Sequence, residues 1–275
     1  MKTLAFTLDL EPDYAGLVGG YKIFENTREI EEILARISSL GAKITVFVVG
    51  EIFEKYPHII KIFEKFNCEF EAHSYTHNVD RPDIEDEISK SRQAYFNYFG
   101  KHPRGYRVPQ GRVSDKTVRL LKKYNFLYDS SIFPSYYPNP FRYLFCKRCI
   151  YYTGNTDIVE IPFTSITPLR FTLSLSYLKL LGINFFLESF RLFGLPDNIC
   201  FNTHLHDFIV KEESFSRLPK FWKFIYGRNK FKGIDFCTMF LEYAKDQGYR
   251  FKYMSKLYEA FVKDKQLGFN EKNDV

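Results

Sequence analysis

Two short clusters of acidic and histidine side chains have the composition of a divalent-metal site. Asp9, Glu11 and Asp13 occupy alternate positions at and just after the end of an apolar stretch. Because Asp9 continues this stretch, its carboxylate is expected to be at least partly buried. A buried carboxylate needs a cation or hydrogen-bond donors. His73 and His77 are four residues apart, so both imidazoles can reach one ion if this segment makes a helical turn. Two histidines with one carboxylate form a hydrolytic metal set that leaves positions open for water and substrate.

Two further clusters offer groups for proton transfer and charge stabilisation. Arg107 begins the run RVPQG, and its guanidinium can orient a carboxylate through two hydrogen bonds. The backbone amides of residues 107–111 can approach a developing oxyanion. His204 and His206 lie in the run HLHD, where an imidazole tuned by Asp207 can protonate a leaving amine. The residues alone leave open which histidine does so.

All four clusters follow stretches with a strand pattern. Strands are expected at residues 3–10, 43–49, 68–72, just before Arg107, and at 125–129, 157–161, 199–205 and 249–253. Helices are expected at 27–40, 51–66 with an interruption at Pro57, 83–99, 114–124 and 234–247. Strands that alternate with helices indicate parallel βαβ units, and seven or eight units close into a barrel. Barrels of this kind assemble their sites at the carboxyl ends of the strands.

The order and spacing of these clusters resemble the polysaccharide deacetylase family, the NodB-homology domain. That family carries Thr-Phe-Asp-Asp, His-[Ser/Thr]-x-x-His, Arg-x-Pro-x-Gly and a late Leu-x-His. The counterparts here are Thr7, Leu8 and Asp9; His73, Ser74 and His77; Arg107, Pro109 and Gly111; and His206, with His204 in the leucine position. The runs YDSS at 128–131 and EIP at 160–162 are similar to secondary motifs of some members. The resemblance covers about residues 3–210.

One departure from the family pattern affects the metal site. Leu10 stands where the family has its second Asp, and Glu11 looks like the replacement ligand, which makes the chain an Asp-x-Glu variant. The resemblance then implies that Asp9 is the catalytic base, that Arg107 orients it and that His206 is the catalytic acid. It implies that Glu11, His73 and His77 bind the metal, with Asp13 as the reserve ligand. The residues implied to bind substrate are Pro109, Gln110, Gly111 and His204.

The resemblance also implies a fold and a reaction. The fold is α/β, a distorted (β/α)7 barrel, expected as one domain over residues 1–262 with an insertion at about 163–198 and a tail at 263–275. The reaction is hydrolysis of the N-acetyl group of a sugar, with Zn²⁺ as the first choice of metal, since this ligand set discriminates weakly against cobalt, nickel, manganese and iron. Two alternatives are a hydrolase of a non-sugar amide and a non-catalytic carbohydrate-binding barrel.

Composition narrows the class of partner. The net charge of +6 in 275 residues is a mild excess that we take to be spread along the chain, and no basic stripe or module typical of nucleic-acid binding is expected. The five cysteines are an odd number without a disulfide-like rhythm. Cys146 and Cys149 lack a second pair at zinc-binding spacing, so we interpret them as ordinary loop thiols.

The remaining expectations concern location. The first residues run directly into a strand pattern without the apolar core of a signal peptide, and no run of 18 apolar residues suggests a spanning helix. We therefore expect a cytoplasmic protein acting on an intracellular or lipid-linked intermediate of surface-glycan synthesis. Residues 163–195 are apolar with scattered basic side chains. They are interpreted either as a peripheral membrane contact at the inner face of the membrane or as a buried or oligomer-facing helix.

Overall fold

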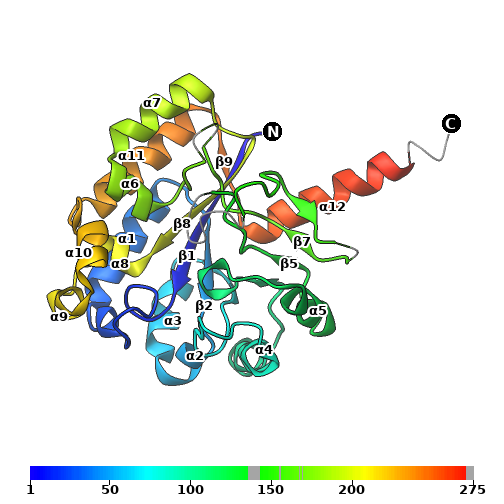
Figure 1. The fold of residues 1–275 in the computed structure, drawn as a ribbon, viewed down its shortest axis with the longest axis horizontal. Coiled ribbons are helices and arrows are strands. Elements are labelled where there is room, and N and C mark those ends of the chain that lie inside the picture. The colour runs from blue at the N-terminus through cyan, green and yellow to red at the C-terminus, as the bar shows by residue number, and fades with distance from the viewer. Residues whose placement is uncertain (136–142, 155, 167, 169, 271–275) are drawn as a thin grey trace.

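The computed structural model describes residues 1–135, 143–154, 156–166, 168 and 170–270 (Figure 1). Its strands are β1 Thr3–Leu10, β2 Ile44–Val48, β3 Glu69–Ala72, β4 Gly105–Tyr106, β5 Tyr128–Asp129, β6 Tyr151–Tyr152, β7 Val159–Glu160, β8 Asn198–His204 and β9 Arg250–Phe251. Its α-helices are α1 Thr27–Ser39, α2 Glu51–Lys55, α3 Pro57–Glu64, α4 Glu85–Phe99, α5 Asp115–Lys123, α6 Leu175–Leu181, α7 Ile183–Phe193, α8 Leu205–Phe208, α9 Glu212–Arg217, α10 Lys220–Gly227, α11 Gly233–Asp246 and α12 Met254–Asn270. Short 3-10 turns span Lys22–Glu25 and Pro109–Gly111.

The described strands form one curled sheet in the order β6-β7-β5-β4-β3-β2-β1-β8, with β9 paired to β1. Every pairing is parallel except that of β6 with β7. The chain just after β7 reaches back to β8, where Thr164 N donates to Cys200 O at 3.2 Å. Helices surround the strands (Figure 1). The predicted α/β fold of the distorted NodB barrel type is therefore confirmed.

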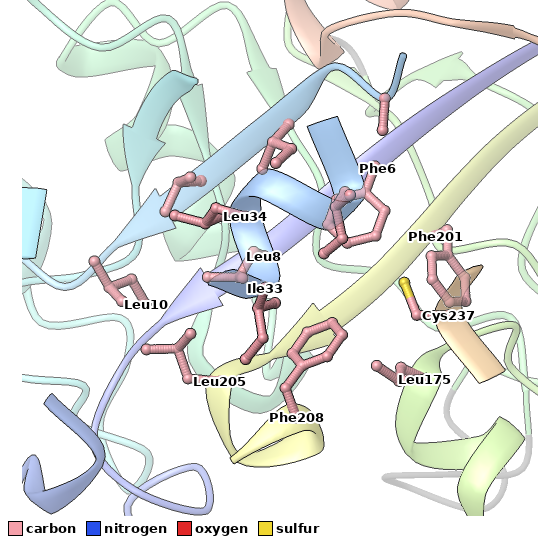
Figure 2. Close-up of a cluster of buried hydrophobic side chains, with 14 of the residues drawn as sticks. Phe6, Leu8, Leu10, Ile33, Leu34, Leu175, Phe201, Leu205, Phe208 and Cys237 are labelled. Carbon is pink, nitrogen blue, oxygen red and sulfur yellow. The ribbon is translucent and has the colours of Figure 1, made fainter. Parts of the chain in front are cut away.

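The central strand β1 separates two environments by alternation of its side chains. Leu8 and Leu10 point into the main core with helix α1, whose Ile33 and Leu34 meet them there (Figure 2). Successive side chains of a strand point to opposite faces. Asp9 therefore faces the inside of the curled sheet. Leu10 is fully buried in the core, so its side chain points away from Asp9. Glu11, two residues after Asp9, is the next residue whose carboxylate can lie on the same side.

Local sequence signals explain where several helices begin and end. The Ser114 hydroxyl accepts a hydrogen bond from Thr117 N at 3.1 Å, and the two residues form a reciprocal capping box at the start of α5. Gly41, at φ +86°, follows the last turn of α1. Pro57 occupies the first turn of α3, which splits the predicted helix at 51–66 into α2 and α3. The sequence patterns did not predict β6, the short helices α8, α9 and α10, or the 17-residue helix α12.

The segment predicted as an insertion holds two helices, α6 and α7. Phe186 is fully buried and Phe190 packs against Phe240 of α11, with ring centroids 5.9 Å apart. This side of the segment is therefore core, as the buried-helix interpretation has it. At the other end of the chain, α12 runs through the boundary predicted at 262/263, and residues 271–275 of the expected tail lie outside the described part. The domain limits stay a prediction.

Two further observations bear on location. Among the described residues, no helix is both long enough and apolar enough to cross a bilayer. All five cysteines lie in the described part of the chain and none is in a disulfide.

Candidate active site

The polar clusters singled out in the sequence meet at the carboxyl edge of the sheet. Asp9 is the penultimate residue of β1 and is paired with His204, the last residue of β8. His73 follows β3 and Arg107 follows β4, and these two strands are paired through Ala72 and Tyr106. All four side chains line one pocket of about 820 Å³ of open space. Parallel strands with their ends in register thus bring together residues that are up to 195 positions apart.

Glu11, His73 and His77 form a buried cluster that fits a metal ion. Oε2 of Glu11 lies 3.2 Å from Nε2 of His73 and 2.8 Å from Nε2 of His77. The ligand atoms of the three residues all lie within 4.8 Å of one another. Burial alone would raise the pKa of Glu11, but the two imidazoles, His77 first, hold it well below its usual range.

The second nitrogen of His73 shows why this cluster calls for a cation. Nδ1 of His73 lies 2.8 Å from the carbonyl oxygen of Arg107, which can only accept a hydrogen bond, so Nδ1 carries the proton. In the neutral ring, Nε2 then presents a lone pair to the Glu11 carboxylate. Two lone pairs facing each other in a buried site need a proton or a metal between them. Oε1 of Glu11 is also buried without a hydrogen-bond partner among the described residues.

The segment 73–77 reaches this geometry as a loop, so the expected helical turn is wrong. Ser74 and His77 both adopt positive φ values, 60° and 61°, and the Ser74 hydroxyl accepts from His77 N at 3.0 Å. The Glu87 carboxylate holds the bend by accepting from the amide and hydroxyl of Thr76 at 2.9 and 2.6 Å. The two imidazoles converge because the backbone bends back, with ring centroids 5.1 Å apart.

Arg107 fixes the orientation of Asp9. Its Nη1 donates to Asp9 Oδ1 at 2.5 Å and also to Asn202 Oδ1 at 2.9 Å. Its guanidinium lies between the rings of Phe47 and Phe163, 3.9 and 4.4 Å from their centroids. A guanidinium held on both faces and at its edges has little freedom. Arg107 therefore holds Oδ1 of Asp9 in place, and Oδ2 lies on the side of His204, 3.5 Å from its Nε2.

The two late histidines occupy different environments. His204 lines the pocket with 18% of its side chain exposed, and its Nε2 lies 3.5 Å from Asp9 Oδ2. His206 lies behind it, parallel to the His204 ring at 4.7 Å and packed against Tyr14 and Tyr226. His206 is only 3% exposed and is absent from the described lining of the pocket.

The pKa values of His204 and His206 also differ. Burial works against a charge on His204, but its hydrogen bond to Asp207 and the nearby carboxylate of Glu11 raise its pKa to about 9. Burial and then the neighbouring charge of His204 lower the pKa of His206 to about 3. Nδ1 of His204 lies 3.1 Å from Asp207 Oδ2, which leaves Nε2 directed toward the pocket. A protonated donor thus faces the site from His204 and a neutral ring is packed behind it.

The loop after Arg107 contributes backbone to the pocket wall. Gln110 and Gly111 line the pocket, whereas Pro109 is buried and is not among its described lining. Gly111 adopts φ +63°, and a Cβ there would lie 2.5 Å from the carbonyl oxygen of Ser131. The Val108 and Gly111 amides already donate to Ser131 Oγ and Val108 O. Gln110 is therefore the residue whose amide is the best oxyanion donor in this loop.

Asp13, the reserve ligand, lies outside the metal-binding cluster. Its Oδ2 accepts from the Ser214 hydroxyl at 2.6 Å and its Oδ1 from Ile23 N at 3.3 Å. Burial raises its pKa above the ordinary value for an aspartate. Asp13 thus ties the loop after β1 to helix α9.

Several lining residues were missed by the sequence reasoning. Asn202 lies two positions before His204 on the same face of β8, so strand alternation could have indicated it. Trp222 and Tyr226 reach the pocket from α10, and Ser176 and Tyr177 reach it from α6. These four come from short helices without a motif, and the single tryptophan was the only available signal.

The first half of the chain is similar in sequence to known deacetylases. The family model described as "Polysaccharide deacetylase" matches residues 2–128. The Peptidoglycan deacetylase-like protein FGM2 of Gibberella zeae is 29% identical over 123 residues, which cover 43% of this chain and 34% of that protein. The chain thus spans about a third of the length of this curated relative.

Solved structures extend the likeness to the whole fold. The Bc1960 peptidoglycan N-acetylglucosamine deacetylase superposes with a TM-score of 0.54 at 17% identity, covering 94% of this chain and 88% of that one. Puue allantoinase superposes with a TM-score of 0.64 at 16% identity, covering 94% and 89%. Such low identities show a common fold alone. Residues 2–128 therefore resemble the polysaccharide deacetylase family, and the whole chain shares the fold of the solved structures named above.

Proposed function

We propose that this protein is a metal-dependent hydrolase that removes the N-acetyl group from an N-acetylated sugar. One observation carries the proposal: a buried carboxylate, Glu11, lies between the Nε2 atoms of His73 and His77 in the pocket that also holds the Asp9–Arg107 pair. The named deacetylases among its relatives support the same reaction class. The proposed base Asp9 and ligand Glu11 lie at the end of β1, and the two histidines follow β3.

Glu11, His73 and His77 would hold the metal, with Zn²⁺ as first choice for two imidazoles and one carboxylate. When bound, such an ion lowers the pKa of a coordinated water and polarises the acetyl carbonyl. The chain's own residues do the remaining work. Asp9, oriented by its hydrogen bond from Arg107, accepts the proton of the attacking water through Oδ2. The amide of Gln110 faces the developing oxyanion.

We assign the acid role to His204 in place of His206. Protonation of the leaving amine requires a charged imidazole that reaches the pocket, and His204 satisfies both conditions while Asp207 supports its charge. His206 keeps the His204 ring in place from behind, with Tyr14 and Tyr226 packed on it. This proposal moves to His204 the acid role that the sequence resemblance implied for His206.

The walls of the pocket suit a sugar ring. Trp222, Tyr177 and Phe133 present apolar surface, and Ser174 and Ser176 present hydroxyls. Aromatic faces with a few polar groups are typical of specific small-ligand sites. We propose an intracellular or lipid-linked intermediate of surface-glycan synthesis as substrate. The five cysteines, none in a disulfide, support a reducing compartment such as the cytoplasm.

The test is acetate release by the purified protein from a panel of N-acetylated nucleotide sugars, lipid-linked sugars and oligosaccharides. Each substrate is assayed after chelation and again after adding back Zn²⁺. Metal-restored acetate release from at least one sugar supports the proposal. Release from none of them, with hydrolysis of allantoin or another non-sugar amide, would assign the second enzyme class. A protein that binds metal and sugar without releasing acetate would be the non-catalytic barrel.

A further inference from the structure

The surface around α9 and α10 carries most of the chain's excess positive charge. Residues 211–232 hold seven basic and two acidic side chains, a net charge of +5, compared with +6 for the whole chain. The charge is therefore not spread along the chain, as composition alone had suggested. Within the described part, Lys220, Lys223 and Arg228 make no ion pair. Their charge remains available to an anionic partner.

The same surface exposes large apolar side chains between these cations. Phe221, Phe224 and Phe231 are 65%, 63% and 70% exposed. Helix α10 has no fully buried residue, so these rings are not packed into the core as those of α7 are. Exposed phenylalanines alternating with lysines and arginines are typical of segments that lie in the headgroup region of a bilayer.

The surface is continuous with the mouth of the candidate active site. Trp222 and Tyr226 of α10 line the pocket, while Phe221 and Phe224 of the same helix point outward. In Figure 1, α9 and α10 lie at the outer edge of the molecule, next to α8 and away from α5 and α12. A partner bound to this edge would lie directly beside the pocket opening.

We propose that α10 and the turn at 228–232 dock this protein on an anionic lipid bilayer, with the pocket opening at the bilayer surface. The phenylalanines enter the headgroup region and the unpaired cations contact lipid phosphates, two interactions that reinforce each other. Docking would bring a lipid-linked sugar within reach of the pocket, and this role of the surface rests on the proposed function. It also moves the predicted membrane contact from residues 163–195 to residues 220–232.

Vesicle co-sedimentation tests the docking without any chemistry. The full chain is mixed with vesicles of phosphatidylcholine alone, or of phosphatidylcholine with phosphatidylglycerol. We expect strong binding only to the anionic vesicles. The variant F221S/F224S, and separately K220E/R228E, should lower the partition coefficient by at least about tenfold. None of these four residues lines the pocket, so acetate release from a soluble sugar should be unchanged.

Two matched controls localise the effect. K116E/K263E makes the same charge change on exposed positions of α5 and α12, and should leave vesicle binding within about twofold of the parent. L192S/F193S removes exposed apolar side chains from α7 and should also leave binding intact. Binding lost in the α7 variant, or retained in both α10 variants, would overturn the proposal. So would a dimer seen by light scattering that F221S/F224S dissociates, since the surface would then belong to a second copy.

Loss of vesicle binding and loss of deacetylation are separable outcomes. A protein that binds anionic vesicles but releases no acetate from any sugar contradicts the proposed reaction and supports the docking surface. A protein that deacetylates soluble sugars but never binds vesicles contradicts the docking surface alone. Circular dichroism of each variant confirms that the fold is kept.

Discussion

The two halves of this chain contribute to the candidate site in different ways. The first 111 residues supply the cluster of Glu11, His73 and His77 and the Asp9–Arg107 pair, all at strand ends. The part beyond residue 170 supplies His204 and the walls contributed by α6 and α10. The difference indicates that the candidate ion site depends on residues fixed by strand ends and a hydrogen-bonded loop, whereas substrate walls can come from short helices with no shared motif.

The sharpest test of the first half removes a metal ligand. His73→Ala leaves Glu11 and His77 without the third donor, so bound metal should fall from about one ion per chain to near zero. Acetate release should fall at least about 10³-fold, because no ion remains to activate water. Metal analysis after dialysis and an acetate assay measure the two effects. His102→Ala, an exposed histidine, is the control and should change neither.

A second change separates the base from the metal within the same half. Asp9→Asn keeps an oxygen for the Arg107 bond but cannot accept a proton, so metal content should be retained while kcat falls about 10²–10⁴-fold. Steady-state kinetics with parallel metal analysis check this. Full activity in Asp9→Asn would reject Asp9 as base and leave the fold and the metal cluster in place.

The third test decides which histidine of the second half does chemistry. His204→Ala should lower kcat by about 10²-fold or more with metal retained, since the pocket loses its protonated donor. His206→Ala should keep activity within about tenfold but lower the free energy of unfolding by about 1–3 kcal/mol, because a cavity opens beside Tyr14 and Tyr226. Kinetics and denaturant unfolding of both variants measure this, and the opposite pattern would restore the assignment made from sequence.

The strands of the first half and the clustering of Glu11, His73 and His77 could be predicted because a periodic signal and a polar motif coincide there. Strand β1 was predicted at its observed limits, and Glu11 followed from its place on the inward face. That His204 and not His206 is paired with Asp9 could not be foreseen, because both histidines lie within three residues and only the register of β8 with β1 distinguishes them. The walls from α10 were missed because this eight-residue helix carries no motif that points to a site.

The smallest expected effect is a pH dependence of the free energy of unfolding, and it concerns two strands between the halves, β5 and β7. Asp129 of β5 and Glu160 of β7 are paired in register and fully buried, and their side chains interact. Glu160 accepts from the amides of Ser131 and Ile132, and the Ser131 hydroxyl bridges Asp129 to the loop after Arg107. This carboxylate pair therefore supports the strand ends that carry the site.

Burial raises the pKa of Asp129 to about 6 and that of Glu160 well above its ordinary value. A raised pKa means that the native state keeps protons that the unfolded chain releases. The pair's contribution is therefore fully present below about pH 4 and decreases as pH rises through 6 and beyond. Glu160→Gln keeps the acceptor for both amides and gains a donor for Asp129, so Asp129 can stay ionised.

The free energy of unfolding of the parent protein should decline between pH 5 and 8. In Glu160→Gln we expect this decline to be smaller by roughly 2 kcal/mol. Guanidinium unfolding followed by circular dichroism measures this, with chelator present so that the pH dependence of metal binding does not contribute. Glu29→Gln, on the exposed face of α1, is the control and should follow the parent profile. If Glu160→Gln and the parent decline in parallel, the buried carboxylates do not share a proton. Asp129 and Glu160 would then both be charged, and the amides of Ser131 and Ile132 and the Ser131 hydroxyl would stabilise them.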